Sequence, residues 1–359
     1  MTGRGPAHLL VKPAGPDCNL DCGYCFYAST AAQFPGSRAH RMSDEVLRHT
    51  MRRFLSEGGD ALAITFQGGE PTLMGLPFYQ RAVELQQQYG RGQTISNALQ
   101  TNGVLLDRAW LGFLSRYRFL VGLSIDGPAH VHDRYRVDHG RKGTHATVEA
   151  RARALLDAGV SVNALTVVTD HAVEHAAEIY RYLVDLGFEW LQFIPDGSSP
   201  HAVAPERYAV FLTTVFDLWK ADFVEGRPTT TVRAFESLAS VRAGRQPFDC
   251  TMLDTCGNYL VVEHDGGIYA CDFYVEPQWR LGNVASASLA ALLAGDRQRA
   301  FGARKAARSE DCAHCPWLSS CHGGCPKDRG PDDKTRYCAA TRAFLAHADA
   351  PLNRLVRRL

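Results

Sequence analysis

Long apolar runs and an excess of charge of one sign are both missing from this chain. No segment approaches the roughly 18 consecutive apolar residues of a membrane helix, and 39 basic residues face 38 acidic ones, giving a formal net charge of +1. The opening MTGRGPAHLL contains no apolar core of signal-peptide length. We therefore expect a cytoplasmic protein that binds neither a membrane nor a nucleic acid.

Metal-ligand spacing is missing among the fourteen histidines, so His40, His132 and His264 are expected to be surface or hydrogen-bonded residues. Cysteine, in contrast, is abundant. Eleven cysteines exceed what packing requires, and in a reducing compartment this surplus indicates metal ligation rather than disulfide formation.

The first two thirds of the chain alternate β-rich runs with helical patterns, which predicts βαβ units around a parallel sheet. The predicted strands are 8–11, 62–67, 94–100, 119–125, 160–168 and 190–194, and the main predicted helices are 43–57, 77–89, 144–158, 173–186 and 205–225. Six units are too few for an eight-stranded barrel, so we expect an α/β fold with a partial (β/α)6 TIM-like barrel. After residue 235 the pattern changes to short strands, a hairpin around 265–267 and clustered cysteines, and 337–359 looks helical.

Three cysteines follow the first predicted strand with the spacing CxxxCxxC: Cys18, Cys22 and Cys25. Three thiolates can hold three irons of a 4Fe-4S cluster and leave the fourth iron open. The methionine amino and carboxylate groups of S-adenosyl-L-methionine (AdoMet) can chelate such an iron. With Tyr24 before the last cysteine, the segment resembles the radical S-adenosylmethionine (radical SAM) superfamily. A zinc site or three chance thiols are the alternatives.

Polar residues at the ends of the other predicted strands are candidate cofactor contacts, because active sites assemble at that rim of an α/β barrel. In FQGGEPTL, Gly68 and Gly69 permit close backbone approach, and Glu70 offers a carboxylate to an ammonium group. The motif recurs in the superfamily at the amino group of the cofactor, although alone it reads as a tight turn. The remaining candidates for cofactor or peptide contacts are Gln67, Asn102, Ser124, Leu191 and Gln192. Residues that form turns or cap the next helix are the alternative.

The other eight cysteines are the number that two fully ligated 4Fe-4S clusters require. Their arrangement resembles the SPASM extension of peptide-modifying radical enzymes. The resemblance assigns Cys250, Cys256, Cys271 and Cys325 to a first auxiliary cluster, and Cys312, Cys315, Cys321 and Cys338 to a second. Spacing alone leaves another grouping open, in which Cys312, Cys315, Cys321 and Cys325 form one zinc-ribbon-like site.

Strings such as CNLxCxYCFY, FQGGEPTL, LQTNG, LSIDGP and CDFYVxxxWRLGN are similar to those of the anaerobic sulfatase-maturating enzymes. The resemblance implies O2-independent oxidation of a cysteine or serine in a nascent or unfolded sulfatase peptide to Cα-formylglycine. It implies three 4Fe-4S clusters, AdoMet and an electron donor such as flavodoxin or ferredoxin. Asp272, beside Cys271, matches the family's catalytic base. The Pro-, Gly- and Ser-rich stretch 195–204 departs from the family pattern.

The resulting domain prediction is a radical SAM partial barrel over 1–235, a small cysteine-rich SPASM iron–sulfur domain over 236–345 and a helical tail over 346–359. A rival function with the same architecture is a peptide maturase that forms thioether or carbon–carbon crosslinks. A non-catalytic iron–sulfur or zinc-binding protein represents a different class.

Overall fold

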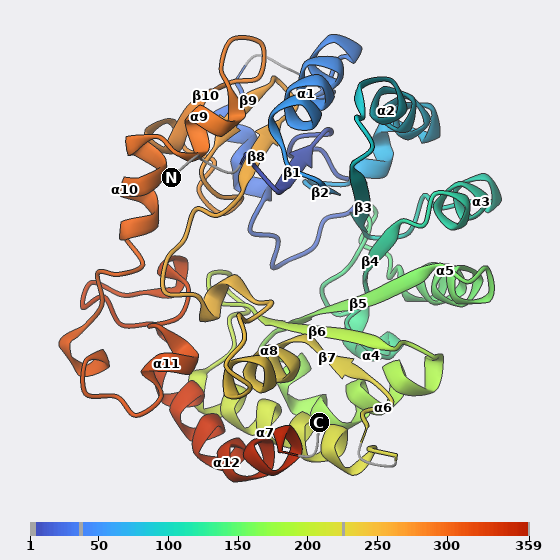
Figure 1. Cartoon of the computed structure of the whole chain (residues 1–359). Helices are drawn as coiled ribbons and strands as arrows, with labels where there is room; N and C mark the ends of the chain where they lie inside the picture. The colour runs from blue at the N-terminus through green and yellow to red at the C-terminus, as the bar shows by residue number, and fades with distance from the viewer. Residues whose placement is uncertain (1–4, 36–38, 225–226, 358–359) are drawn as a thin grey trace.

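The computed structural model describes residues 5–35, 39–224 and 227–357. Its strands curve around a common interior with helices on the outside (Figure 1). The strands are β1 (His8–Lys12), β2 (Ala61–Phe66), β3 (Thr94–Thr101), β4 (Leu120–Ser124), β5 (Ser161–Val168), β6 (Trp190–Pro195), β7 (Thr231–Val232), β8 (Leu260–Glu263), β9 (Gly267–Tyr269) and β10 (Arg280–Asn283). The sheet order is β10-β9-β8-β1-β2-β3-β4-β5-β6-β7, and neighbours from β1 to β7 are parallel. The six predicted strands and the partial barrel are therefore confirmed.

Helices follow most of the barrel strands. They are α1 (Asp44–Glu57), α2 (Leu76–Tyr89), α3 (Arg108–Arg116), α4 (Ala129–His132), α5 (His145–Asp157), α6 (Ala176–Leu186), α7 (Pro205–Ala221) and α8 (Arg233–Arg242). Ser43 starts α1 as predicted, because its side chain accepts a hydrogen bond from Val46 N at 3.2 Å. The helix expected over 205–225 ends at Ala221 instead, and position 225 lies outside the described residues.

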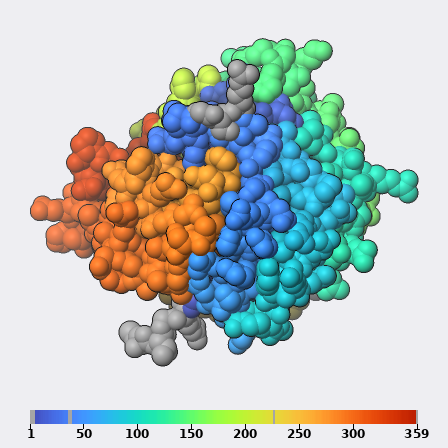
Figure 2. Space-filling model, turned by 90° about the horizontal axis from the view of Figure 1, so that it is seen from above, coloured from blue at the N-terminus to red at the C-terminus, as the bar shows by residue number. Residues whose placement is uncertain are grey.

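The cysteine-rich region joins the barrel sheet directly. β8 pairs in parallel with β1, with Leu9 opposite Leu260, and β9 turns back antiparallel to β8. The predicted hairpin is confirmed: Gly266 has φ +80°, and Asp265 accepts a hydrogen bond from Gly267 N at 2.8 Å. Seen from above, the amino-terminal atoms in blue border the orange atoms of this region (Figure 2).

The remaining helices are short except for the last: α9 (Leu289–Leu293), α10 (Asp296–Ala303), α11 (Leu318–Cys321) and α12 (Cys338–Val356). α12 packs on α7 and α8, where Phe344 contacts Phe216 and Phe235 with ring centroids 5.7 and 5.5 Å away. The predicted limit between 345 and 346 falls inside this continuous helix, and the domain limits otherwise stay predictions. Within the described ranges, no helix has the length and apolar character needed to cross a membrane. Positions 1–4, 358 and 359, which belong to the predicted first domain and tail, lie outside them.

Candidate functional site

The loop after β1 carries Cys18, Cys22 and Cys25 and is fastened to the turn after β2. Gly69 N donates to Gly15 O at 2.8 Å, and Glu70 N donates to Asp17 O at 2.7 Å. A Cβ atom on Gly69 would lie 2.1 Å from Asp17 O, so only glycine allows this approach. Gly68 has φ +132°, which also favours glycine. The turn thus fixes the backbone of the cysteine loop against the end of the sheet.

Glu70 is fully buried and holds the ends of β2 and β3 together. Its carboxylate accepts hydrogen bonds from Thr72 N at 2.9 Å, Thr101 Oγ1 at 2.7 Å and Asn102 N at 2.8 Å. Burial raises the pKa of Glu70, while these donors oppose the shift. Much of the carboxylate is therefore already engaged by protein donors. The predicted contact between Glu70 and a cofactor ammonium stays a prediction.

Asn102 extends from the end of β3 to the cysteine loop. Its Nδ2 donates to Asn19 Oδ1 at 2.8 Å and lies 3.8 Å from Cys18 Sγ. Leu20 N lies 3.4 Å from the same sulfur and donates to it. The structure thus places Asn102 directly beside the first cysteine, as its position at a strand end led us to expect.

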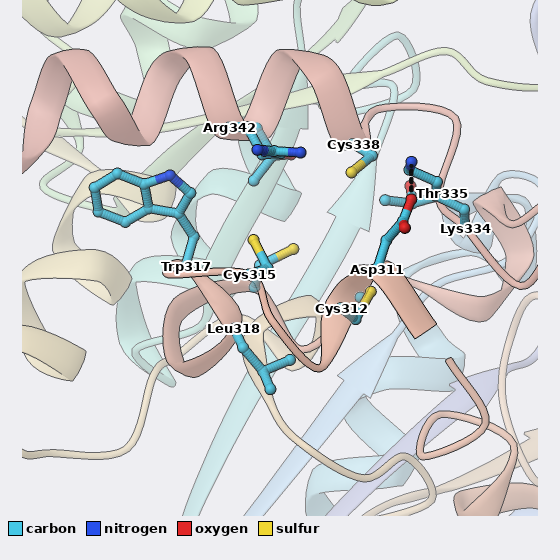
Figure 3. Close-up of a pocket in the computed structure, with 12 residues that line it drawn as sticks. Asp311, Cys312, Cys315, Trp317, Leu318, Lys334, Thr335, Cys338 and Arg342 are labelled. Carbon is cyan, nitrogen blue, oxygen red and sulfur yellow. Dashed lines mark hydrogen bonds and ion pairs between the residues drawn. The ribbon is translucent and has the colours of Figure 1, made fainter. Parts of the chain in front are cut away.

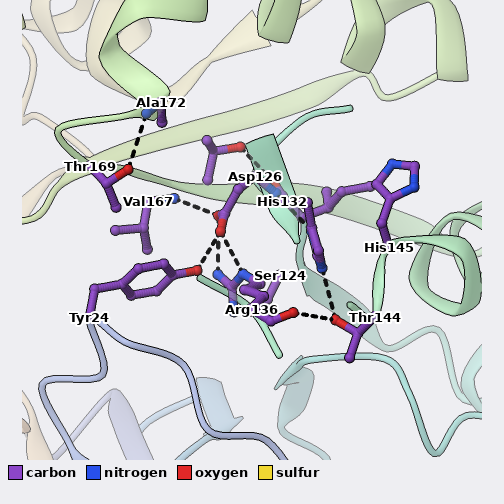
Figure 4. A network of polar contacts seen from close by, with 12 residues as sticks. Tyr24, Ser124, Asp126, His132, Arg136, Thr144, His145, Val167, Thr169 and Ala172 are labelled. Carbon is purple, nitrogen blue, oxygen red and sulfur yellow. Dashed lines mark hydrogen bonds and ion pairs between the residues drawn. The ribbon is translucent and has the colours of Figure 1, made fainter. Parts of the chain in front are cut away.

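Tyr24 is buried in a charged network that the sequence did not reveal (Figure 4). Its hydroxyl donates to Asp126, whose carboxylate also accepts from Arg136 Nε at 2.8 Å, Arg136 Nη2 at 3.2 Å and Val167 N at 2.9 Å. Burial opposes the charge of Arg136, but Asp126 raises the pKa of Arg136 above its ordinary value. Asp126 lies in the LSIDGP string, so its place after a strand was a usable signal. The network holds the residue that precedes Cys25.

The other candidates differ in the face of the sheet that they occupy. Gln100 Nε2 donates to Ser124 Oγ at 3.2 Å, and Gln192, half-buried like Gln67, accepts from Asn163 Nδ2 at 3.5 Å. Leu191 is fully buried in the main hydrophobic core. Successive strand residues point to opposite faces, so Leu191 lies opposite Gln192. The structure thus assigns Leu191 to packing and corrects its expected place among the rim contacts.

Asp272, which is 9% exposed, lies where the cysteine-rich region meets β1. Its Oδ1 accepts a hydrogen bond from Tyr259 OH at 2.8 Å and lies 3.5 Å from Cys271 Sγ. The fully buried Lys12 donates from Nζ to the Asp272 carbonyl at 3.2 Å and lies 3.6 Å from the ring centroid of Tyr27. Burial lowers the pKa of Lys12, and Asp272 acts in the opposite direction. The carboxylate and the cysteine loop are therefore connected through one buried lysine.

Lys305 connects the segments that carry the first four auxiliary cysteines. It is fully buried, and its Nζ donates to Cys250 O at 3.3 Å, Thr251 O at 2.7 Å and Gly324 O at 2.9 Å. Burial raises the pKa of Cys256, whereas Lys305 lowers it. Burial also raises the pKa of Cys271 and Cys325, the latter to about 11. One ammonium group thus orders the surroundings of this cysteine group.

Cys312, Cys315, Cys321 and Cys338 line one small pocket, bordered by Trp317 and Arg342 (Figure 3). Cys338 begins α12, and Cys312 and Cys315 face it from the preceding loop. Cys325 is absent from the lining, which is limited to described residues. The pocket therefore brings together the four cysteines that the SPASM resemblance assigns to one cluster, and not the zinc-ribbon-like alternative.

The donor chemistry of the three cysteine groups suits iron–sulfur clusters. All eleven cysteines are free thiols. Burial raises the pKa of Cys18 and Cys250 to about 12 and that of Cys22 to about 11, so without iron these thiols stay protonated at neutral pH. Ligation releases those protons and couples cluster binding to pH.

The family comparisons agree with this geometry. The radical SAM superfamily model matches residues 13–183, and the model of the iron–sulfur cluster-binding SPASM domain matches residues 250–316. The cysteine-type anaerobic sulfatase-maturating enzyme of Clostridium perfringens (strain 13 / Type A) is 37% identical over 357 residues, covering 96% of this chain and 96% of that protein. The chain belongs to the anaerobic sulfatase-maturating enzymes. As a radical SAM enzyme with a SPASM domain, it uses AdoMet and iron–sulfur clusters.

Both target types occur among the related sulfatase-maturating enzymes. The serine-type enzyme of Bacteroides thetaiotaomicron is 35% identical over 348 residues, covering 90% of this chain and 83% of that protein. The solved structure of native anSMEcpe with bound AdoMet and Cp18Cys peptide matches with a TM-score of 0.91 and 35% identity, covering 98% of this chain and 99% of that chain. The predicted fold class and family are thus confirmed.

Proposed function

We propose that this enzyme oxidises a cysteine or serine of a sulfatase-type peptide to Cα-formylglycine without consuming O2. The observation that carries the proposal is the position of Asp272, which contacts Cys271 and is joined through Lys12 to the strand that precedes the AdoMet-type cysteine loop. Relatives that cover nearly the whole chain are named cysteine-type or serine-type sulfatase-maturating enzymes, and a related structure contains AdoMet and a peptide.

The proposed cofactors are AdoMet and three 4Fe-4S clusters. Cys18, Cys22 and Cys25 hold the cluster that binds AdoMet. Cys250, Cys256, Cys271 and Cys325 hold the first auxiliary cluster, and Cys312, Cys315, Cys321 and Cys338 hold the second. The common lining of one pocket by the last four supports this partition, as does the Lys305 clamp between the segments of Cys250 and Cys325.

When bound, the AdoMet cluster supplies a 5'-deoxyadenosyl radical that takes a Cβ hydrogen of the peptide, and the auxiliary clusters take an electron. Asp272 accepts the thiol or hydroxyl proton. Its Oδ1 is oriented by Tyr259, whereas Oδ2 accepts no hydrogen bond from the described residues and is the oxygen that faces the proton. Asn102, Glu70, Gln67, Ser124 and Gln192 bind and orient AdoMet or the peptide at the strand ends.

Exchange of Asp272 for Asn tests this role. The D272N enzyme keeps the size and the Tyr259 contact of the side chain but loses the base, so AdoMet cleavage persists while formylglycine falls by about 100-fold or more. The measurement is anaerobic incubation with dithionite and a sulfatase-motif peptide, with 5'-deoxyadenosine quantified by chromatography and the peptide analysed by mass spectrometry.

Asp254→Asn is the matched control, because Asp254 is an exposed aspartate of the same region. It should form both products at the unchanged rate. Full formylglycine formation by D272N would remove Asp272 from the mechanism. An intact crosslink in the peptide, with no formylglycine from the unmodified enzyme, would instead support the thioether or carbon–carbon maturase.

The proposed partners are an unfolded or nascent sulfatase segment and a low-potential electron donor such as flavodoxin or ferredoxin. Peptides with cysteine and with serine at the target position, offered in equal amounts, distinguish the two target types. The product ratio from this competition gives the preference directly.

A further inference from the structure

One histidine and carboxylate group lies apart from the cysteine centres. His130 belongs to α4, His175 ends the 3-10 turn Ala172–His175, and Glu178 lies in the first turn of α6. One ligand atom from each lies within 4.8 Å of the others, and no second group of three His, Cys, Asp or Glu residues meets that distance in the described chain. Because α4 and α6 follow β4 and β5, the group lies at the carboxyl-end rim of the barrel.

Both imidazoles approach the same oxygen. His175 Nδ1 lies 3.1 Å from Glu178 Oε2, and His130 Nε2 lies 3.4 Å from that atom. Two ligand atoms bound to one tetrahedral Zn²⁺ at its usual Zn–N and Zn–O lengths are about 3.3 Å apart. The observed separations therefore equal the edges of such a coordination shell. The 3.4 Å separation is also longer than an ordinary hydrogen bond.

A neighbouring histidine supports the ligand that comes from α4. His171 hydrogen-bonds to the backbone of His130, and its ring centroid lies 4.9 Å from that of His175. His171, His175 and Glu178 are spaced i, i+4 and i+7, which places them on one helical face. Such support orients metal-binding imidazoles in known sites.

We propose that His130, His175 and Glu178 form a site for a Zn²⁺-class divalent cation, with water completing the shell. Two imidazoles and one carboxylate are a ligand set that zinc uses in proteins. The ion braces α4 against α6. The segment after α4 carries Arg136 of the network around Tyr24, so the brace stabilises the wall beside the cysteine loop.

The test uses the holoenzyme with its clusters reconstituted anaerobically, dialysed against ZnCl2 and analysed for zinc. We expect about one zinc per chain, with only nitrogen and oxygen neighbours at about 2.0–2.1 Å in X-ray absorption. The thermal midpoint should rise with zinc. His130→Ala and His175→Ala should each weaken zinc binding at least tenfold and abolish the rise, without changing the iron content.

His49→Ala is the matched control, because His49 also faces a glutamate, Glu45, at 3.8 Å but lacks a third ligand. It should bind zinc like the unmodified protein. Glu178→Gln preserves shape, guards against a folding defect and should also weaken binding. Sulfur neighbours at about 2.3 Å, equal zinc uptake by the His130 and His175 variants, or no uptake at all would each overturn the proposal.

Discussion

The amino-terminal cysteine loop and the carboxyl-terminal cysteine region are held in place by different means. The loop is fastened to strand ends through backbone bonds, such as Gly69 N to Gly15 O, and through the Glu70 carboxylate. The carboxyl-terminal region has little regular structure around its cysteines. There, buried cations donate to several carbonyls at once, because a lysine has three donors and an arginine has five.

Arg329 illustrates the second means. Its guanidinium donates to Gly323 O at 3.1 Å, Lys305 O at 3.0 Å and Arg304 O at 3.2 Å. These carbonyls have no strand neighbour of the kind that the barrel provides. A protein that must shape loops around large inorganic groups thus replaces sheet hydrogen bonds with multi-donor side chains.

Lys305→Met should break the carboxyl-terminal arrangement and has the largest expected effect. Three buried carbonyls lose their donor, at about 1–3 kcal/mol each, and we expect the loss of one cluster, about four irons per chain. Iron analysis and thermal unfolding under anaerobic conditions measure both effects. Lys220→Met is the control, because Lys220 pairs with Asp217 at the surface. Full iron content in K305M would show that the clamp is dispensable.

Arg136→Met should break the support of the amino-terminal loop. Removing one partner of a buried ion pair costs about 3–5 kcal/mol, and Asp126 would remain buried and unpaired by it. Chemical denaturation under anaerobic conditions gives the change in stability. Arg141→Met removes an exposed pair with Asp21 and should cost at most about 1 kcal/mol. Equal losses in both variants would contradict the importance of burial.

Gly69→Ala sharpens the comparison by disturbing only the backbone contact. Since the new Cβ would lie 2.1 Å from Asp17 O, the loop must move. We expect at least a tenfold slower release of 5'-deoxyadenosine, about 1.4 kcal/mol in barrier height, with the auxiliary clusters retained. Gly59→Ala provides the control, because a Cβ there meets no atom within 4 Å. An unchanged rate in G69A would mean that the loop tolerates displacement.

The smallest effect concerns pH and His132, which lies in the Tyr24 network. Burial lowers the pKa of His132 to about 3, so between about pH 6.5 and pH 3 the unfolded chain binds a proton that the folded chain does not. Stability should therefore fall with decreasing pH by up to about 1.4 kcal/mol per unit. Denaturation between pH 7 and 5 in zinc-free buffer measures this slope. His132→Gln should flatten the slope, whereas His49→Gln should leave it unchanged.

The sequence predicted those features that depend on local spacing. The cysteine loop, the GGEP turn and the six barrel strands follow from short motifs and from alternation of strand and helix patterns. The one misplaced candidate, Leu191, was chosen for its string rather than for the alternation that puts it in the core. The grouping of the last four cysteines came from resemblance, because spacing alone left two partitions open.

Features that depend on distant pairing could not be read from the sequence. Lys12 and Lys305 are fully buried, although lysines are ordinarily exposed, and their carbonyl partners lie elsewhere in the chain. The pairing of His130 with Glu178 also crosses two βα units and shows no local spacing. A sequence motif for a metal site would have required its ligands on one element.

The parallel pairing of β1 with β8 bears on how the chain folds as it leaves the ribosome. Leu9 must wait for Leu260, roughly 250 residues later, before its strand gains a second neighbour. Until then the growing polypeptide presents an open edge next to the segment with the first three thiols, and open edges recruit other chains. Translation must therefore be nearly finished before the amino terminus is sealed, so the two halves mature as one unit.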